Sequence, residues 1–203
     1  MKKVFLLAGF TFLLGTVTFA QFTYGVKAGL NLANATIKSD AGSASTSALT
    51  GLHLGATAEY AVNDKFSVEP GLLFSTKGVK YSGEGNARDV VNYLEIPVNG
   101  VYKIDAGSAK VLLNAGPYLG FALSGKSKFD GGSESLKIGS GEDKDLKAFD
   151  FGLNFGAGVL LNNKITIGLQ YGLGIANLAP VTDGGNTIRN KVFAISVGYK
   201  FVK

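Results

Sequence analysis

The chain has 203 residues, a net charge of +5 and no cysteine. The charge is mild and the basic residues are scattered, which argues against a nucleic-acid-binding protein. The lack of cysteine excludes a disulfide scaffold of the kind that small secreted domains use. Glycine is abundant, with 29 residues, but it lacks the regular spacing of a collagen.

Residues 1–20, MKKVFLLAGFTFLLGTVTFA, have the organisation of a secretory signal peptide. Two lysines precede an apolar stretch, and the small-residue site Thr18-Phe19-Ala20 suits cleavage. The alternative is a membrane-anchor helix, which needs about 18 apolar residues. This run is shorter and is broken by glycines and threonines. We therefore predict a signal peptide at 1–20 and one exported domain at 21–203.

Apolar and polar residues then alternate with a period of two in eight segments, and helical periodicity is absent. The clearest segment is KITIGLQYGLGIA at 164–176, where one face is apolar and the other is small and polar. The segments are longer than ordinary globular strands and reach the length of about 9–11 residues that a tilted transmembrane strand needs. The predicted strands cover 23–33, 49–62, 65–76, 91–104, 109–123, 147–161, 164–176 and 190–202.

The connections between these segments alternate in length. Asn63-Asp64, residues 105–108 and Asn162-Asn163 predict tight turns, whereas the other connections are long and polar. This alternation is typical of an outer-membrane barrel. The sequence thus predicts an all-β fold, an eight-stranded antiparallel up-and-down transmembrane β-barrel with short periplasmic turns and long extracellular loops. The predicted loops are 34–48, 77–90, 124–146 and 177–189.

In such a barrel the apolar face of each strand meets lipid, and the outward aromatic residues of this chain fall at two levels. Aromatic rings are expected at both membrane–water interfaces, whereas the core of a soluble sandwich would show no such levels. The predicted girdle at the turn end contains Tyr24, Tyr60, Phe66, Tyr102, Tyr199 and Phe201. The predicted girdle at the loop end contains Phe74, Phe121, Phe149 and Phe193.

The opposite faces of the strands carry charged and amide side chains separated by glycines. An eight-stranded barrel is only wide enough for side chains to fill its interior. Opposite charges inside it must pair, because burying an unpaired charge is costly. The predicted interior charges are Lys27, Glu59, Glu69, Glu95 and Lys200. All of them except Glu95 belong to the turn-side half and are expected to form one network.

Four stretches of the mature chain resemble a known family. They are TYGVKAGLNLAN at 23–34, YLEIPVNGVYKI at 93–104, FDFGLNFGAGVLL at 149–161 and the closing VGYKF. They resemble the PorT-type outer-membrane β-barrel family, which implies an eight-stranded barrel in a Gram-negative outer membrane. PorT itself is associated with a protein-secretion and gliding apparatus, and the family implies no catalytic motif. The C-terminal aromatic residue that such barrels use appears as Phe201, followed by two further residues.

Catalytic and metal-binding patterns are weak. The only histidine, His53, lies on the inward phase, where Ser45, Ser47 or Asp150 would have to approach it to build a nucleophilic site. A hydrogen-bonded filler of a polar lumen is the simpler interpretation. The acidic loop segments 129–137 and 140–147 lack the spacing of a calcium loop. We predict no catalytic residue, no cofactor site and no metal site.

Two functions remain open. In the first, the barrel is a structural or interaction protein with a packed polar lumen. It would contact outer-membrane lipid and offer its long loops to envelope proteins, for example as an accessory of a secretion or surface-assembly apparatus. In the second, it is a narrow porin-like channel for small solutes or ions, although wide aqueous channels need about 16 strands. Both place the exported protein in the cell outer membrane.

Overall fold

The computed structural model describes residues 22–40, 42–82, 86–182 and 185–202. The signal peptide predicted at 1–20 lies outside the described residues. No helix in the described part of the chain is long and apolar enough to cross a membrane. The strands are β1 Phe22–Ser39, β2 Gly42–Ser43, β3 Thr46–Ala61, β4 Phe66–Tyr81, β5 Arg88–Ala106, β6 Ala109–Phe129, β7 Gly132–Ser135, β8 Phe149–Leu161, β9 Ile165–Gly174 and β10 Thr187–Lys200.

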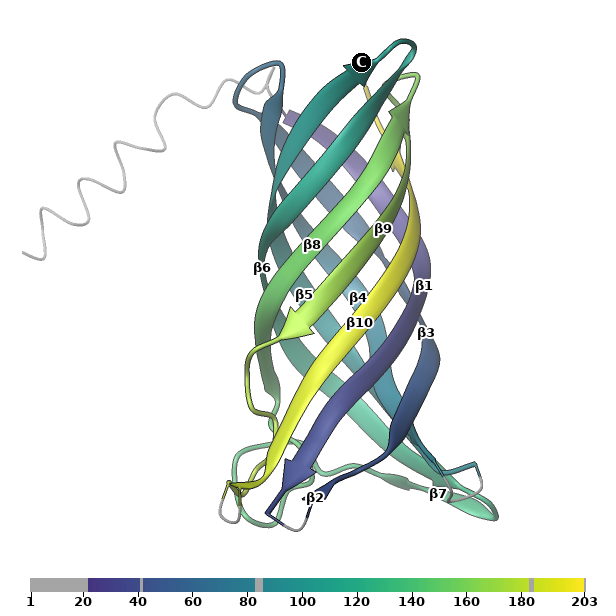
Figure 1. The fold of residues 1–203 in the computed structure, drawn as a ribbon, viewed down its shortest axis with the longest axis vertical. Coiled ribbons are helices and arrows are strands. Elements are labelled where there is room, and N and C mark those ends of the chain that lie inside the picture. The colour runs from purple at the N-terminus through teal and green to yellow at the C-terminus, as the bar shows by residue number, and fades with distance from the viewer. Residues whose placement is uncertain (1–21, 41, 83–85, 183–184, 203) are drawn as a thin grey trace, which may run out of the picture.

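Eight of the ten described strands form a closed antiparallel ring (Figure 1). Each long strand pairs with the next one along the chain, and β10 closes the ring on β1 over the register from Gly25↔Lys200 to Lys38↔Thr187. The two short strands, β2 and β7, pair antiparallel with β1 and β6 at the loop end. The predicted eight-stranded antiparallel barrel is confirmed. Closure leaves no long strand with an unpaired edge.

The tight turns lie together at one end of the barrel, the upper end in Figure 1. Asn162 and Asn163 have positive φ angles of 50° and 55°, as a two-residue hairpin turn requires. At the first turn, the Asn63 side-chain oxygen accepts hydrogen bonds from the backbone N–H of Lys65 (2.9 Å) and of Phe66 (2.8 Å). Asparagine therefore ends these strands by two different mechanisms.

The strands continue further at the loop end than the sequence analysis predicted. Residues 34–39 belong to β1 and residues 77–81 belong to β4, so the predicted loops 34–48 and 77–90 are largely strand. The hydrogen-bond ladder continues there, for example at Thr36↔Arg189. The predicted strand ends were wrong because hydrophobic alternation stops where the lipid ends. Backbone hydrogen bonding between strands does not depend on lipid and continues beyond that level. In the third loop, residues 124–129 likewise continue β6 and 132–135 form β7.

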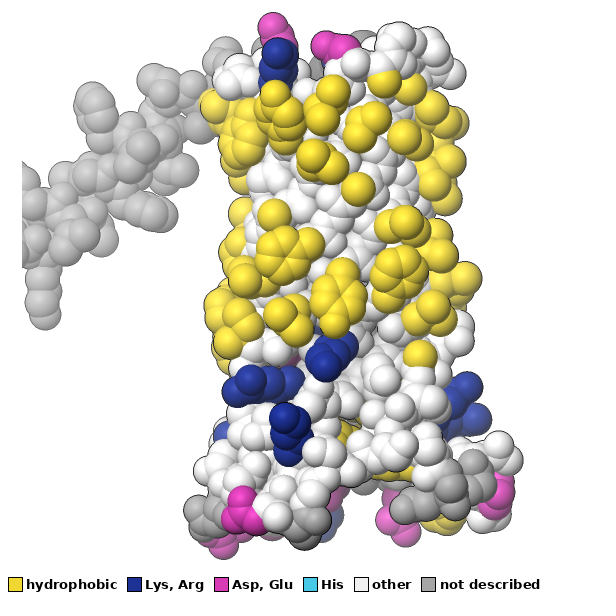
Figure 2. Space-filling view, viewed as in Figure 1, with side chains coloured by type: hydrophobic (Ala, Val, Ile, Leu, Met, Phe, Trp, Pro, Cys, Tyr) yellow, Lys and Arg dark blue, Asp and Glu magenta, His cyan; other side chains and the backbone are white. Residues whose placement is uncertain are grey.

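Each of the eight long strands exposes large apolar side chains on its outward face, and the face in Figure 2 shows them as an apolar band between the two ends of the barrel. Its aliphatic side chains are strongly exposed, up to 62% for Leu52 and Leu54. Such a continuous exposed apolar surface is far larger than the patches that soluble monomers expose. Lipid is the solvent that suits it.

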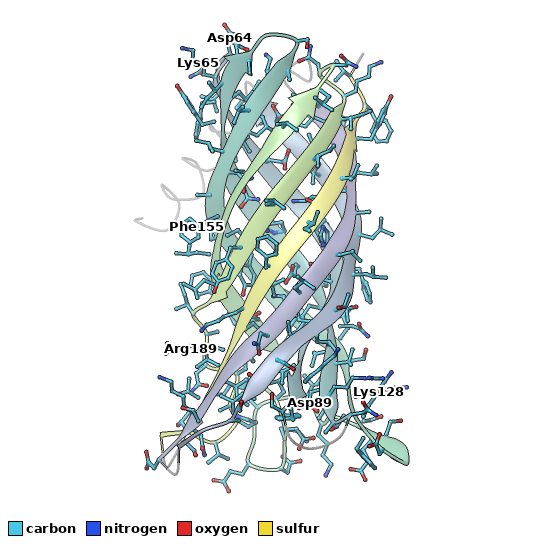
Figure 3. The ribbon with its side chains drawn as sticks, turned by 45° about the vertical axis from the view of Figure 1, so that its right-hand side comes forward. Asp64, Lys65, Asp89, Lys128, Phe155 and Arg189 are labelled. Atoms are coloured by element: carbon cyan, nitrogen blue, oxygen red, sulfur yellow. The ribbon has the colours of Figure 1, made fainter. Side chains whose placement is uncertain are left out.

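The predicted aromatic residues lie on this band, toward its two ends. At the turn end, Phe66 is the cross-strand partner of Tyr102, and the rings of Tyr199 and Phe201 lie 5.5 Å apart. At the loop end, Phe121 and Phe149 are partners, with their ring centroids also 5.5 Å apart. The structure adds a pair that was not assigned to either girdle, Phe155 with Tyr171 on β8 and β9. Figure 3 shows Phe155 on the outer surface of the wall.

Candidate functional site

The lumen contains two separate groups of paired charges. We call the first the turn-end cluster, made of Glu59, Glu69, Lys103 and Lys200. We call the second the loop-end cluster, made of Lys77, Glu95 and Asp150 with Tyr93, Tyr118 and Asn190 around them. Every member is at most partly exposed, so the barrel wall and the other side chains keep these charges away from bulk water.

Glu59 organises the turn-end cluster. Its two carboxylate oxygens accept hydrogen bonds from different ammonium groups, one from Lys103 and one from Lys200. The second carboxylate, Glu69, lies 3.6 Å from the Lys200 Nζ atom. These four residues come from β3, β4, β5 and β10, so the cluster links the barrel wall across its interior.

Asp150 organises the loop-end cluster. Its side chain is completely buried, and its Oδ2 atom accepts hydrogen bonds from Lys77 (3.0 Å), Asn190 (2.9 Å) and Tyr118 (3.2 Å). Lys77 also pairs with Glu95, and its ammonium group lies 4.3 Å from the centroid of the Tyr118 ring. Two carboxylates and an aromatic face thus hold the Lys77 ammonium group in place together.

Glycine makes room for the Tyr118 ring in this cluster. A Cβ atom built on Gly152 would lie 2.6 Å from the Tyr118 Cε1 atom and 2.3 Å from the Leu173 carbonyl oxygen. Any larger residue at this position would displace the ring from Asp150. The glycine spacing of the FDFGLNFGAGVLL strand thus serves lumen packing.

The predicted interior charges are only partly brought together. Glu59, Glu69 and Lys200 lie in one cluster, whereas Glu95 pairs with Lys77 in the other. Lys27 forms no ion pair with a described residue. Its ammonium group donates to the Gln170 side chain at 3.3 Å, between the two clusters. The predicted single turn-side network is therefore wrong as regards Lys27, because an amide from β9 takes the place of the carboxylate.

Sequence reasoning missed three of the charged residues. Lys103 continues the inward phase of Glu95 and Asn99 by simple alternation, so the signal was present. Lys77 continues the inward phase of Glu69 in the same way, but it was assigned to a loop. Asp150 was considered only as a partner of His53, whereas the structure places it against Lys77.

His53 belongs to a separate hydrogen-bonded chain in the lumen. Its Nδ1 atom lies 2.8 Å from the Asn31 side-chain oxygen, and the Asn31 amide donates to the Ser75 hydroxyl at 3.0 Å. No hydrogen bond joins His53 to Ser45, Ser47 or Asp150 within the described chain. The arrangement does not form a nucleophilic triad. Among the described residues, no group of three or more His, Asp or Glu side chains could hold a metal ion.

Apolar residues of the loops close the barrel mouth on the outer side of the loop-end cluster. Leu146 and Leu178 are 8% and 1% exposed, and they pack with Val91 and Tyr93 from the barrel wall. The Leu178 backbone is held on both sides, since its N–H donates to the Ile188 carbonyl and its carbonyl accepts from Lys147. We call this group the mouth cap. Part of the predicted 124–146 loop is therefore packed inward rather than free.

The remaining space lies mostly outside the lumen. Two interior cavities border Lys27, with volumes of about 30 and 60 Å³. The first holds about one water molecule and the second only a few. By contrast, a hollow of about 560 Å³ opens at the loop end between the β1–β2 hairpin and the segment that precedes β10.

Replacing Glu69 with Ala is expected to lower the thermal unfolding midpoint by a few degrees. Glu69 is the peripheral member of its cluster, with a side chain that is 19% exposed and a single long ion pair. A loss of about 1 kcal/mol is typical of such a contact and shifts the midpoint by about 2–4 °C. The measurement is heat modifiability on gels, with Glu142→Ala in an exposed loop as control. An unchanged midpoint for the Glu69 variant would remove this residue from the network.

Comparison with known proteins agrees with the barrel. A family model described as outer membrane protein beta-barrel domain matches residues 19–179. A search of curated proteins found no match.

Similar solved structures are small barrels. The neisserial surface protein NspA is 18% identical, with 88% of this chain and 97% of that chain covered and a TM-score of 0.48. OprG of Pseudomonas aeruginosa is 18% identical, with 89% and 96% covered and a TM-score of 0.48. Ail, the attachment invasion locus protein of Yersinia pestis, is 18% identical, with 89% and 99% covered and a TM-score of 0.45.

Proposed function

Since the chain belongs to the outer membrane protein β-barrel domain family, we propose that it is a closed barrel that acts as a structural and interaction protein. It anchors in the outer membrane and presents its loop end to another envelope component. By its resemblance to the PorT-type family, we assign it an accessory role in a secretion or surface-assembly apparatus.

The observation that carries this proposal is the filled lumen. Three layers obstruct it in succession, namely the turn-end cluster, the loop-end cluster and the mouth cap. An eight-stranded barrel has little interior space beyond its side chains, and the two cavities beside Lys27 in the described lumen are small. A solute would have to break buried ion pairs to pass, whereas a partner at the loop end needs no such change.

The β6–β7 hairpin leans away from the barrel axis in Figure 1. Phe129 at its tip is 45% exposed although it lies well beyond the apolar band. The ring lies over Gly132, where an added Cβ atom would lie 3.1 Å from its Cε2 atom. An exposed aromatic side chain on a projecting hairpin is typical of a protein contact, so we assign the first contact to this hairpin.

Conductance in a planar lipid bilayer tests the closed lumen. We expect the purified protein to insert without any stable open level. A Lys77→Ala variant, which loosens the loop-end cluster, should show brief openings under the same conditions. A stable open level in the unmodified protein would favour the narrow channel and overturn the closed barrel.

Photo-cross-linking in intact cells tests the interaction role. Phe129 is replaced by benzoylphenylalanine, and Lys65 in the tight turn at the opposite end serves as the matched control site. We expect position 129, but not position 65, to capture a partner that belongs to a secretion or surface-assembly complex. Recovery of a lone, heat-modifiable barrel from both positions contradicts the proposal.

A further inference from the structure

Basic side chains lie on the outer surface of the barrel just beyond the apolar band, at the loop end, on the face that Figure 2 shows. They lie on the outward phase of the strand extensions, and none of them forms an ion pair with a described residue. We call them the outer basic belt. Its members are Lys38, Lys80, Arg88, Lys128, Arg189 and Lys191.

Three members of the belt face one another directly across neighbouring strands. Lys80 on β4 is the register partner of Arg88 on β5, which in turn is the partner of Lys128 on β6. Like charges directly opposite on one face of a sheet are destabilising. Lysines often protect exposed strand edges from aggregation, but β4, β5 and β6 are paired on both sides here. An anion bound beside these three cations would offset the repulsion.

The other members line a groove that is basic at one end and apolar at the other. The groove has a volume of about 480 Å³ and lies over β1, β9 and β10. Lys38, Arg189 and Lys191 supply its charge, whereas Leu173 and Ile175 belong to the apolar band. Leu173 is the direct register partner of Lys191, so the change from apolar to basic occurs within one residue pair. This shape fits an amphiphile whose anionic head lies next to its hydrocarbon chain.

Figure 3 labels Arg189 and Lys128 on opposite sides of the barrel, so the belt extends around it and is not confined to one patch. The strand carboxylates Glu59, Glu69, Glu95 and Asp150 lie in the lumen clusters, and no described carboxylate forms an ion pair with a belt side chain. Within the described part of the chain, the belt therefore presents a positive surface without ion-pair partners just beyond the apolar band, where lipid headgroups are expected to begin.

We propose that the outer basic belt binds the phosphate groups of glycolipid headgroups in the outer leaflet, with the β1–β10 groove as the principal site. Arginine and lysine at this position form charge-assisted hydrogen bonds to phosphate oxygens. A soluble polyanion would match the charge but not the apolar end of the groove. The inference goes beyond the partner at the β6–β7 hairpin and does not depend on it.

Binding is measured in nanodiscs of phosphatidylcholine that contain bisphosphorylated lipid A as the probe, by native mass spectrometry of the retained lipid. The double variant R189Q/K191Q removes two charges, and K65Q/K164Q at the turn end removes two charges as the matched control. Each cation near an anionic surface raises the binding affinity about fivefold. The loss of two cations should therefore weaken lipid A binding by the first variant roughly thirtyfold. The control should bind like the unmodified protein.

A second variant separates binding from folding. R88Q relieves the repulsion between Lys80 and Lys128, so its unfolding midpoint in neutral detergent should rise by about 2 °C while lipid A binding falls. A structural role for Arg88 would lower the midpoint instead. Equal binding by R189Q/K191Q and the unmodified protein would overturn the proposal, as would equal binding of dephosphorylated lipid A. Preference for soluble dextran sulfate over lipid A would also overturn it.

Discussion

Replacing Lys77 with Ala should lower the free energy of unfolding by about 3–5 kcal/mol, the cost of removing one partner of a buried ion pair. Lys77 is 3% exposed and is the only described cation that contacts Glu95 or Asp150. Without it, two carboxylates face each other in a lumen with almost no room for water. Unpaired buried charges are among the few causes of losses this large.

The measurement is urea unfolding after folding into lipid vesicles, with Lys110→Ala as the matched control. Lys110 pairs with Asp105 at 3.6 Å, but its side chain is about one-third exposed, at 34%, and that of Asp105 is exposed, at 74%. A surface pair of this kind contributes less than about 1 kcal/mol. If the two lysine variants lost equal stability, the loop-end cluster could not be the element that holds the lumen closed.

A Lys77→Met variant separates charge from packing. Methionine keeps an unbranched chain against the Tyr93 and Tyr118 rings, which lie 5.0 and 4.3 Å from the ammonium nitrogen. It removes the charge, with the hydrogen bond to Asp150 and the cation–π contact that depend on the ammonium group. We expect most of the stability loss of the Ala variant to remain, because the carboxylates are still unpaired.

The sequence alone predicts the barrel well, because lipid imposes a simple rule on it. A strand that crosses a membrane must alternate over its full length, and the alternation from Lys164 to Ala176 is almost free of errors. Turn residues with the right conformational tolerance, such as Asn162-Asn163, then fix the count of hairpins. The rule stops at the headgroups, so the strand extensions that carry Lys80 and Arg189 were assigned to loops.

The pairing of charges inside the barrel is harder to predict. Alternation tells that Glu59, Glu95 and Lys200 point inward, but it gives no information about which strands face each other across the lumen. That depends on the stagger of the strands around the ring. Lys200 and Glu59 are 141 positions apart in the chain, and they meet only because β10 closes on β1 beside β3. The mouth cap was missed because Leu146 and Leu178 lie in segments without periodicity.

Replacing Glu59 with Ala is expected to be the most damaging change at the turn end, with a loss of about 3–5 kcal/mol in the free energy of unfolding. Glu59 accepts from both Lys103 and Lys200, whose side chains are 13% and 9% exposed. Its removal brings two ammonium groups together without a shared anion. Glu69 offers only its distant contact to Lys200, so it cannot replace Glu59.

A double-mutant cycle shows whether this loss comes from charge. Adding Lys103→Met to the Glu59→Ala variant removes one of the stranded cations, so the pair of changes should cost less than the sum of the single ones by about 1–3 kcal/mol. Urea unfolding of the three variants and the unmodified protein gives the coupling energy. The matched cycle of Glu69→Ala with Lys103→Met should show much weaker coupling, since no ion pair joins those side chains in the described structure. Additive losses in the first cycle would mean that Glu59 acts through packing, and the turn-end cluster would then not be an electrostatic closure of the lumen.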